Sequence, residues 1–432
     1  MKEPSRPKSG GARKRAAGSP PRGTGPALSK RHRAGTHRLV SPEETLERVR
    51  PLMPVMGITR IANISGLDCL GIPTVMVCRP NSRSLAVSQG KGLDLVSAKV
   101  SGLMESIEMY HAERITLPLK LASYNELRFT LPVVDVTRLP RLSSSSYHDN
   151  LRLLWIEGRE LRHGTPVWLP FELVHVNFTL PLPAGSGSFF MSSNGLSSGN
   201  HLLEAISHGI CEVVERDATT LWNALDDEGR YRTRLDLATV DDPNCREVMA
   251  RFERAGVELA VWESTSDIGL PCFICTIAER ELDPLRPLYP TTGMGCHPSR
   301  EVALLRALTE AAQARVTLIS GSRDDLGRSR YQSTQDEAYW LRTRALMGAR
   351  GPMRRFQDVP SLESETLEED VTFELERLNA AGLEQVVVVD LTRPEFGIPV
   401  VRVVIPGLES LHDAPGYVRG PRADKVLRER RS

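Results

Sequence analysis

One acidic stripe near the middle of the chain has the residue types and spacing of a cation site. Its members are Glu204, His208, Glu212 and Glu215. They follow one another at intervals of four, four and three residues, so a helix would align them along one face. No Lys or Arg occurs between Asn200 and Glu215, and divalent cations relieve the repulsion between such carboxylates. The stripe therefore predicts a metal-binding face, and the alternative is a solvated helix face without chemistry.

The segment before this stripe is rich in Gly, Ser and Asn over residues 192–200. The start of a helix presents unpaired N–H groups and the positive end of its macrodipole, so a loop of small residues can bring an anion close to it. Together, loop and stripe predict a site for metal-bound phosphate. His208 is expected either to orient a carboxylate or to be a satisfied buried histidine.

Two further helices repeat this design. One follows Gly90-Lys91-Gly92 and carries Ser97, Ser101, Glu105 and Glu108 at the same intervals. The other is expected to begin at Ser299, a suitable N-cap, after the glycine-rich segment 292–297. Along it lie Arg306, Glu310 and Gln313, with Arg315 to one side. The five glutamates of the first two helices would suit Mg²⁺ shared with a nucleotide's phosphates.

These blocks resemble the YcaO family, whose members use ATP to activate backbone amides. The resemblance extends from about Gly57 to Gly407 and rests on separate blocks: Gly57-Ile58-Thr59-Arg60, Gly66-Leu67-Asp68, Gly71-Ile72-Pro73, Gly90-Lys91-Gly92, Ser101 with Glu105 and Glu108, residues 192–217, and Arg306 to Glu310 with Gln313 and Arg315. It implies that Mg²⁺ is bound by Glu105, Glu108, Glu204, Glu212 and Glu215. It also implies that ATP is bound by Ser101, Asn200, Arg216, Gln313 and Arg315, with Lys91 as a phosphate contact.

The implied reaction is phosphorylation of a peptide amide oxygen, followed by attack of a nucleophile on the activated carbon. Family members that form azolines commonly end in a PxPxP tail, whereas residues 416–432 contain no such motif. The expectation therefore favours thioamidation over azoline or amidine formation. Residues 403–409 are similar to members that work beside a TfuA-like partner. A precursor peptide or protein is the expected substrate, a homodimer is possible, and a scaffold subunit that binds nucleotide without catalysis is the alternative.

The rest of the sequence predicts the fold and the domain boundaries around this site. Strand-like runs between the helices, without strict βαβ alternation, predict an α+β fold of several sheet-and-helix layers around a central nucleotide site. Residues 1–40 hold 11 Lys/Arg and one Glu, so residues 1–38 are expected to be a disordered basic tail. The YcaO-like domain is placed at residues 39–410 and a charged C-terminal tail at 411–432.

The composition also bears on where the protein works and what it contacts. No run of residues is long and apolar enough to span a membrane, and a nucleic-acid contact through the basic tail is the less favoured explanation of its charge. Seven cysteines without framework spacing predict free thiols in the cytoplasm. Cys272 and Cys275 form a CxxC in an apolar run, where a strand would point them to opposite faces.

Overall fold

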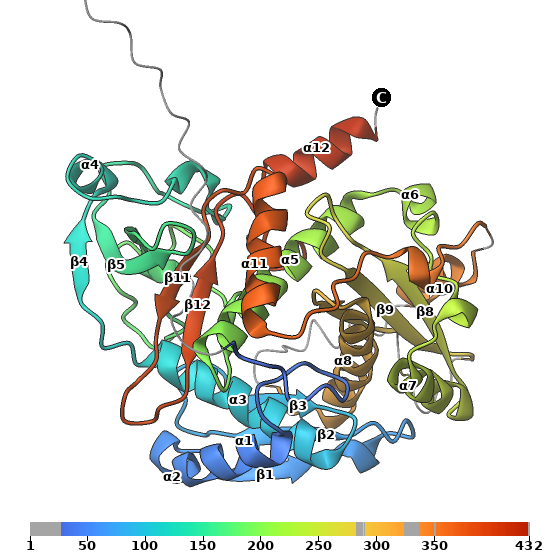
Figure 1. Cartoon of the computed structure of the whole chain (residues 1–432). Helices are drawn as coiled ribbons and strands as arrows, with labels where there is room; N and C mark the ends of the chain where they lie inside the picture. Colours follow the sequence, from blue (N-terminus) through green and yellow to red (C-terminus); the bar gives the residue numbers. More distant parts are fainter. Residues whose placement is uncertain (1–26, 282–287, 289, 324–336, 350, 431–432) are drawn as a thin grey trace, which may run out of the picture.

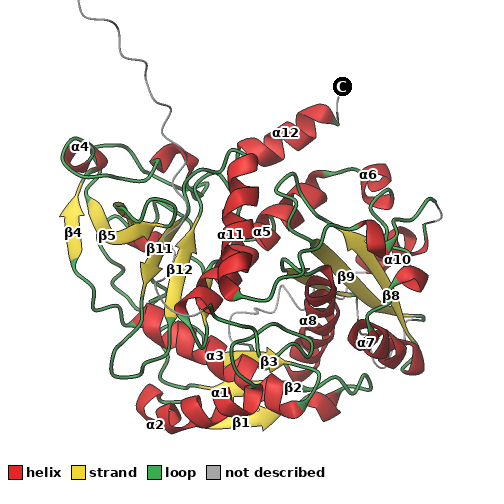
Figure 2. Cartoon of the chain, in the orientation of Figure 1, coloured by secondary structure: helices red, strands yellow, loops and turns green. Residues whose placement is uncertain are grey.

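In the described part of the chain, three antiparallel β-sheets are each backed by one long helix (Figure 1). The structure is a computed structural model that describes residues 27–281, 288, 290–323, 337–349 and 351–430. Helices and strands are mixed throughout the chain without regular βαβ units (Figure 2), which confirms the predicted α+β class. Within the described ranges, no helix combines the length and the apolar character needed to cross a membrane.

The first sheet, in the order β1-β2-β3, is backed by α3. Its elements are α1 (Pro42–Val49), α2 (Met53–Met56), β1 (Arg60–Asn63), β2 (Thr74–Cys78), β3 (Val87–Lys91) and α3 (Leu95–Glu113). Asp94 caps α3, because its carboxylate accepts a hydrogen bond from the backbone N–H of Ser97 at 2.8 Å. Val75 and Val77 of β2 are completely buried beneath α3.

The second sheet has the order β4-β5-β11-β12-β7, with β6 paired to β5, and is backed by α5. Its strands are β4 (Leu119–Ala122), β5 (Leu153–Glu160), β6 (Pro166–Pro170), β7 (Leu196–Ser198), β11 (Val387–Asp390) and β12 (Val400–Val404). Its helices are α4 (Tyr124–Leu127), α5 (Leu202–Ala224), α11 (Leu367–Ala380) and α12 (Pro421–Glu429). In Figure 1, α11 and α12 lie against α5, and Arg422 of α12 binds the buried Asp217 of α5 at 2.9 Å.

The third sheet, in the order β10-β9-β8, is backed by α8. Its elements are α6 (Asp227–Tyr231), α7 (Pro243–Arg254), β8 (Val257–Glu263), β9 (Cys272–Glu279), β10 (Thr291–Cys296), α8 (Arg300–Ser320) and α10 (Glu337–Gly348). Ser299 caps α8, as predicted. Cys272 and Cys275 of β9 belong to different hydrophobic clusters, which confirms that they point to opposite faces of the sheet.

The glycine-rich segments before α3 and α8, predicted to bring an anion to a helix start, lie mostly in the strands β3 and β10. A Cβ at Gly90 of β3 would lie 2.1 Å from the carbonyl oxygen of Ala98 in α3. A Cβ at Gly293 of β10 would lie 2.2 Å from the backbone nitrogen of Ala311 in α8. These glycines are therefore required because helix and strand approach too closely for any side chain.

Residues 27–40 form an ordered segment that crosses α11 and the start of α5, and we call it the N-terminal strap. Lys30 makes a buried ion pair of 2.6 Å with Asp370 of α11. The backbone N–H of Leu39 donates to Glu204 at 3.0 Å. The prediction of disorder over residues 1–38 is therefore wrong for 27–38, since composition does not reveal a buried partner for a single lysine. The remainder of that predicted tail, residues 1–26, lies outside the described residues.

Candidate active site

The three helices that back the sheets are linked in a closed ring. Besides its own sheet, α3 contacts β7 of the second sheet, α5 contacts β10 of the third, and α8 contacts β3 of the first. Each helix presents glutamates, so the ring brings acidic side chains from distant parts of the sequence to one centre. The structure thus joins the three helices that the sequence analysis selected for their common design.

Two glutamates of α3 enter this centre beside strands of two different sheets. Glu105 accepts a hydrogen bond from the backbone N–H of Gln89 in β3 at 3.3 Å. Glu108 accepts one from the hydroxyl of Ser198 in β7 at 2.6 Å. Both acids, predicted as metal ligands, therefore have one oxygen fixed by a neighbouring strand.

The charges of these glutamates act on one another and on those of α5. Burial, together with Glu212, raises the pKa of Glu105 to about 7, although Arg323 and Lys91 oppose the shift. Burial, Glu105 and Glu212 raise the pKa of Glu108 well above its ordinary value. Burial and Glu310 raise the pKa of Glu212, against the pull of nearby arginines. Acids that raise each other's pKa in this way share a site that favours added positive charge.

Glu215 shows the need for a counter-charge most clearly. Burial, Glu310 and Glu212 raise its pKa to about 6 despite Arg216. One of its oxygens, Oε2, is buried and has no hydrogen-bond partner. Arg216 lies 3.6 Å from the other oxygen, and the surrounding glutamates raise the pKa of Arg216 even though burial alone would lower it. Arg216 is therefore held beside the acidic centre, and its predicted contact with ATP stays a prediction.

Asn200 and Glu204 lie at the start of α5 and face the N-terminal strap and α1. The amide nitrogen of Asn200 donates to the hydroxyl of Thr45 at 3.0 Å and its backbone N–H to Glu204 at 3.3 Å. Glu204 also accepts the backbone N–H of Leu39 and lies 3.6 Å from the guanidinium of Arg38. Of the predicted metal ligands, Glu204 is thus the one whose oxygens the strap occupies.

The other predicted nucleotide residues differ in how they are placed. Lys91 of β3 lies 2.9 Å from Glu310 of α8 and so belongs to the acidic centre. Ser101 lies one turn before Glu105 on α3, and Gln313 lies one turn after Glu310 on α8. Their roles toward a nucleotide stay predictions.

Arg315 is engaged elsewhere. Its side chain is 3% exposed and pairs with Asp68 at 3.0 Å and with Glu279 at 2.5 Å. These contacts tie α8 to the loop after β1 and to the end of β9. In this structure, Arg315 thus holds the framework together, and its predicted contact with ATP stays a prediction.

The residues of the centre fit a magnesium nucleotide. In the described part of the chain, no three His, Cys, Asp or Glu side chains stand close enough together to hold a metal ion by themselves. Mg²⁺ is usually bound by one or two carboxylates together with substrate phosphates and water, so it does not need such a cage. The unpartnered oxygen of Glu215 and the raised pKa values mark where a cation would be stabilised.

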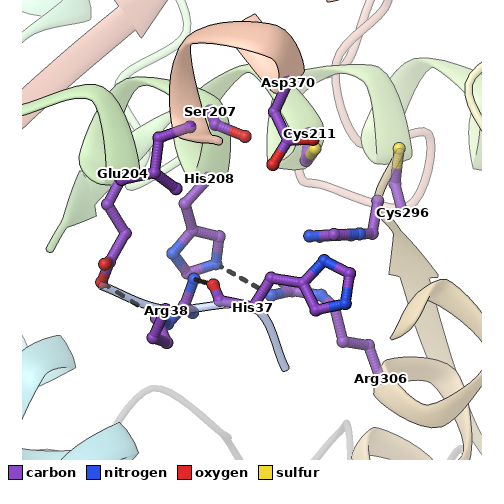
Figure 3. Close-up of a pocket in the computed structure, with 11 residues that line it drawn as sticks. His37, Arg38, Glu204, Ser207, His208, Cys211, Cys296, Arg306 and Asp370 are labelled. Carbon is purple, nitrogen blue, oxygen red and sulfur yellow. Dashed lines mark hydrogen bonds and ion pairs between the residues drawn. The ribbon is translucent and has the colours of Figure 1, made fainter. Parts of the chain in front are cut away.

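His208 lines a small polar cavity together with Glu204 and Asp370 (Figure 3). Its Nε2 accepts a hydrogen bond from Nη1 of Arg306 in α8 at 3.1 Å. Burial and the neighbouring cations, Arg306 first among them, lower the pKa of His208 well below its ordinary value. Of the two predicted roles, a satisfied buried histidine agrees better with this contact than an orienting partner of a carboxylate.

Two residues of this centre received no role in the sequence analysis. Glu310 lies on the predicted stripe of α8 but is not among the predicted metal ligands. Arg402, 1% exposed, donates to the carbonyl oxygens of Ser192 and Asn194 and so fixes the segment before α5. Its signal in the sequence was a lone arginine inside the apolar run Val400–Val404. Burial lowers the pKa of Arg402 to about 10, while Glu212 opposes the shift.

The chain matches known proteins over most of its length. The family model described as "YcaO cyclodehydratase, ATP- and Mg²⁺-binding" matches residues 89–409. A protein of Rhizobium leguminosarum bv. trifolii, described as an uncharacterized protein in the tfuA 3′ region, is 36% identical over 376 residues, which cover 86% of this chain and 88% of that protein.

Two solved structures share the fold. The YcaO protein of Methanopyrus kandleri bound with AMPPCP and Mg²⁺ superposes with a TM-score of 0.72 at 23% identity, covering 91% of this chain and 98% of that one. A heterocyclase in complex with substrate and cofactor gives a TM-score of 0.76 at 25% identity and covers 94% of this chain. This chain spans 56% of the length of that heterocyclase. The chain belongs to the YcaO family of ATP- and Mg²⁺-binding proteins.

Proposed function

We propose that the protein uses ATP to phosphorylate the oxygen of a peptide backbone amide, so that a nucleophile can replace this oxygen. The observation that carries the proposal is the buried ring of glutamates on α3, α5 and α8, where burial, together with the repulsion between the acids, raises the pKa of Glu105 and Glu215. Phosphoryl transfer depends mainly on positioning and on neutralisation of charge, which fixed acids and arginines provide when a magnesium nucleotide is bound.

The residues of the ring divide this work. Glu105, Glu108, Glu212 and Glu215 would hold Mg²⁺, and Glu204 would join them once the strap releases its oxygens. Arg216 stands beside Glu215 and would offset charge on a phosphate from the side of the acidic stripe. Lys91 pairs with Glu310 at the opposite wall, where its ammonium group can reach an anion in the same centre. ATP supplies the phosphoryl group that turns the amide oxygen into a leaving group.

We further propose that the nucleophile is sulfide and the product a thioamide. The support is the relative described as lying in the tfuA 3′ region, which also suggests a TfuA-like partner for this chain. All seven cysteines are free, which agrees with work in a reducing compartment such as the cytoplasm. The substrate is a precursor peptide or a protein. A homodimer stays a prediction.

The test follows the amide oxygen. A candidate peptide is synthesised with heavy oxygen in its backbone amides and incubated with the protein, ATP, Mg²⁺ and sulfide. We expect the label to appear in the released phosphate and the peptide mass to rise by the difference between sulfur and oxygen. Label that stays in the peptide while ATP is hydrolysed would contradict amide activation. A protein that binds ATP but leaves both the peptide and ATP unchanged would support a non-catalytic scaffold.

A further inference from the structure

Asp217 of α5 is a completely buried acid that directly follows Arg216 in the sequence. Nε and Nη2 of Arg422 in α12 each donate to one of its two carboxylate oxygens at 2.9 Å. The backbone N–H of Glu409 donates to the same carboxylate, also at 2.9 Å. Paired hydrogen bonds of this kind between a guanidinium and a carboxylate are strong. Both oxygens of Asp217 are therefore engaged by the C-terminal part of the chain.

The start of α12 is fixed so that Arg422 reaches Asp217. Glu409 accepts the backbone N–H of Gly420 at 2.8 Å and that of Ala423 at 2.9 Å. Because N–H groups at the first turn of a helix have no partner within the helix, a carboxylate there holds the helix in place. The side chain of Arg422 is 15% exposed, and α12 lies against α5 (Figure 1). The pair is therefore part of a fixed contact between α12 and α5.

Arg216 is held more loosely than Arg422. Its Nη1 lies 3.6 Å from a carboxylate oxygen of Glu215, which is longer than a hydrogen bond. The same nitrogen lies 3.7 Å from the sulfur of Met294, a weak acceptor. The side chain of Arg216 is 19% exposed. Arg216 can therefore turn toward a phosphate, or toward another acid, without giving up a close hydrogen bond to Glu215.

Arg422 decides which of these directions is open to Arg216. Arg216 and Asp217 are adjacent on α5, and an arginine side chain is long enough to reach the carboxylate of the next residue. A buried carboxylate that loses its only counter-charge is strongly unfavourable. Without Arg422, Asp217 would therefore draw Arg216 away from the acidic centre. With Arg422 in place, Asp217 is satisfied and Arg216 stays beside Glu215.

We propose that Arg422 is a positioning residue of the nucleotide site, because its pair with Asp217 leaves Arg216 free to face the phosphates of a magnesium nucleotide. This inference rests on the proposed function for the role of Arg216. It gives the C-terminal helix α12 a part in nucleotide binding, although α12 packs on the side of α5 that carries Asp217. Arg422 acts on the nucleotide only through Arg216.

Nucleotide affinity tests this inference without turnover. A fluorescent, non-hydrolysable ATP analogue is titrated with Mg²⁺ into the full-length protein. Arg422→Gln should raise the Kd of the analogue about tenfold, because a charged donor is withdrawn from the phosphates. Adding Asp217→Asn should recover most of this affinity, since no buried carboxylate then attracts Arg216. Asp267→Asn removes the exposed second partner of Arg422, at 2.5 Å, and should bind like the wild type.

A milder pair of variants covers the case in which Arg422→Gln does not fold. Arg422→Lys keeps the charge but loses the paired geometry, so the Kd should rise about threefold. Adding Asp217→Asn to Arg422→Lys should again recover the affinity. A wild-type Kd in folded Arg422→Gln and in Arg422→Lys would overturn the inference.

Arg216→Gln shows whether Arg422 acts through Arg216 or merely supports the fold. Arg216→Gln alone should raise the Kd about tenfold, and adding Arg422→Gln should cause no further rise. Independent effects that multiply would overturn the inference while leaving amide activation intact. A wild-type Kd in Arg216→Gln would contradict the proposed role of Arg216 and the inference with it. The predicted lack of a further rise, in a protein that leaves the peptide unchanged, would support the inference and contradict the proposed function.

Discussion

The ammonium nitrogen of Lys91 lies 2.9 Å from a carboxylate oxygen of Glu310, an ion pair between residues 219 positions apart in the sequence. It joins β3 of the first sheet to α8 of the third and so closes the ring of helices at the acidic centre. Burial alone would raise the pKa of Glu310, but Lys91 and two arginines lower it, so this acid is held in its charged form.

The Lys91–Glu310 pair should contribute measurably to stability. Lys91→Met and Glu310→Gln are combined in a double-mutant cycle on the free energy of unfolding in urea without nucleotide. We expect a coupling energy of about 1 kcal/mol, because both groups are mostly buried. The exposed pair Arg33–Glu365 is the control and should give a coupling near zero. Additive effects of Lys91→Met and Glu310→Gln would show that the pair does not hold the ring together.

Glu215→Gln should separate activity from stability. Loss of a carboxylate that would ligate the metal should lower ATP turnover about 100-fold or more, since several kcal/mol of charge stabilisation are lost. Without nucleotide, the same change should stabilise the protein by roughly 1–2 kcal/mol, because it removes a buried and repelled charge. ATP turnover and thermal unfolding are measured side by side, with the exposed Glu253→Gln as the control. Wild-type turnover in Glu215→Gln would contradict its place in the metal site.

The buried pair Lys30–Asp370 should anchor the strap. Lys30→Met leaves the carboxylate of Asp370 buried without its cation, so we expect a loss of about 3–5 kcal/mol in the free energy of unfolding. The double variant Lys30→Met/Asp370→Leu should recover much of this loss, because neither charge remains. A single variant as stable as the wild type would show that the strap does not depend on this pair.

Acid should loosen the strap at His37. Burial, Lys30, Arg33 and Arg38 lower the pKa of His37 to about 4, while Glu301 opposes the shift and the ring of His297 packs against it. Between pH 6.5 and about 4, a released His37 binds more protons than the packed one, so stability of the packed strap is lost as the pH falls.

The measurement is hydrogen exchange at the backbone amide of Leu39, corrected for the intrinsic effect of pH. The free energy of opening at this amide should fall by roughly 1 kcal/mol as the pH falls from 6.5 to about 4, after allowance for the partial exposure of His37. It should stay level in His37→Gln. Equal pH dependence in both proteins would mean that protonation elsewhere controls the strap.

Gly293→Ala should disrupt the contact between β10 and α8. Its Cβ would lie 2.2 Å from one backbone atom of α8 and 2.4 Å from another, so a strand or helix must shift, at a cost of about 1–3 kcal/mol or more. Gly348→Ala, at the end of α10 with nothing within 4 Å of the new Cβ, should leave the free energy of unfolding almost unchanged. Urea unfolding of the two variants compares them directly.

Much of the fold could be predicted from local patterns. The N-cap Ser299 agrees with the structure, because a capping hydroxyl acts within a few residues. β3 and β10 were missed as strands, because their glycines lower the local preference for a strand. Only the close packing of α3 and α8 against them explains those glycines.

The site could be predicted less completely than the fold. Helical spacing, a local property, places the glutamates of α3 on one face and those of α5 on another, and Glu105, Glu108 and Glu212 from these faces act on one another in the structure. The pairing of Lys91 with Glu310, the burial of Arg402 and the capture of Glu204 by the strap are long-range contacts. A local pattern in a single sequence does not show which distant residues will be in contact, so these three features could not be predicted.

The central claim, that the glutamates of α3 and α5 hold a magnesium nucleotide, is tested most directly by a crystal structure with Mn²⁺ in place of Mg²⁺ and a non-hydrolysable ATP analogue. The anomalous signal of Mn²⁺ locates each ion independently of the protein density. We predict ions bound by carboxylates of the set Glu105, Glu108, Glu212 and Glu215, next to the nucleotide's phosphates. Nucleotide and Mn²⁺ bound at full occupancy away from α3 and α5 would contradict the account.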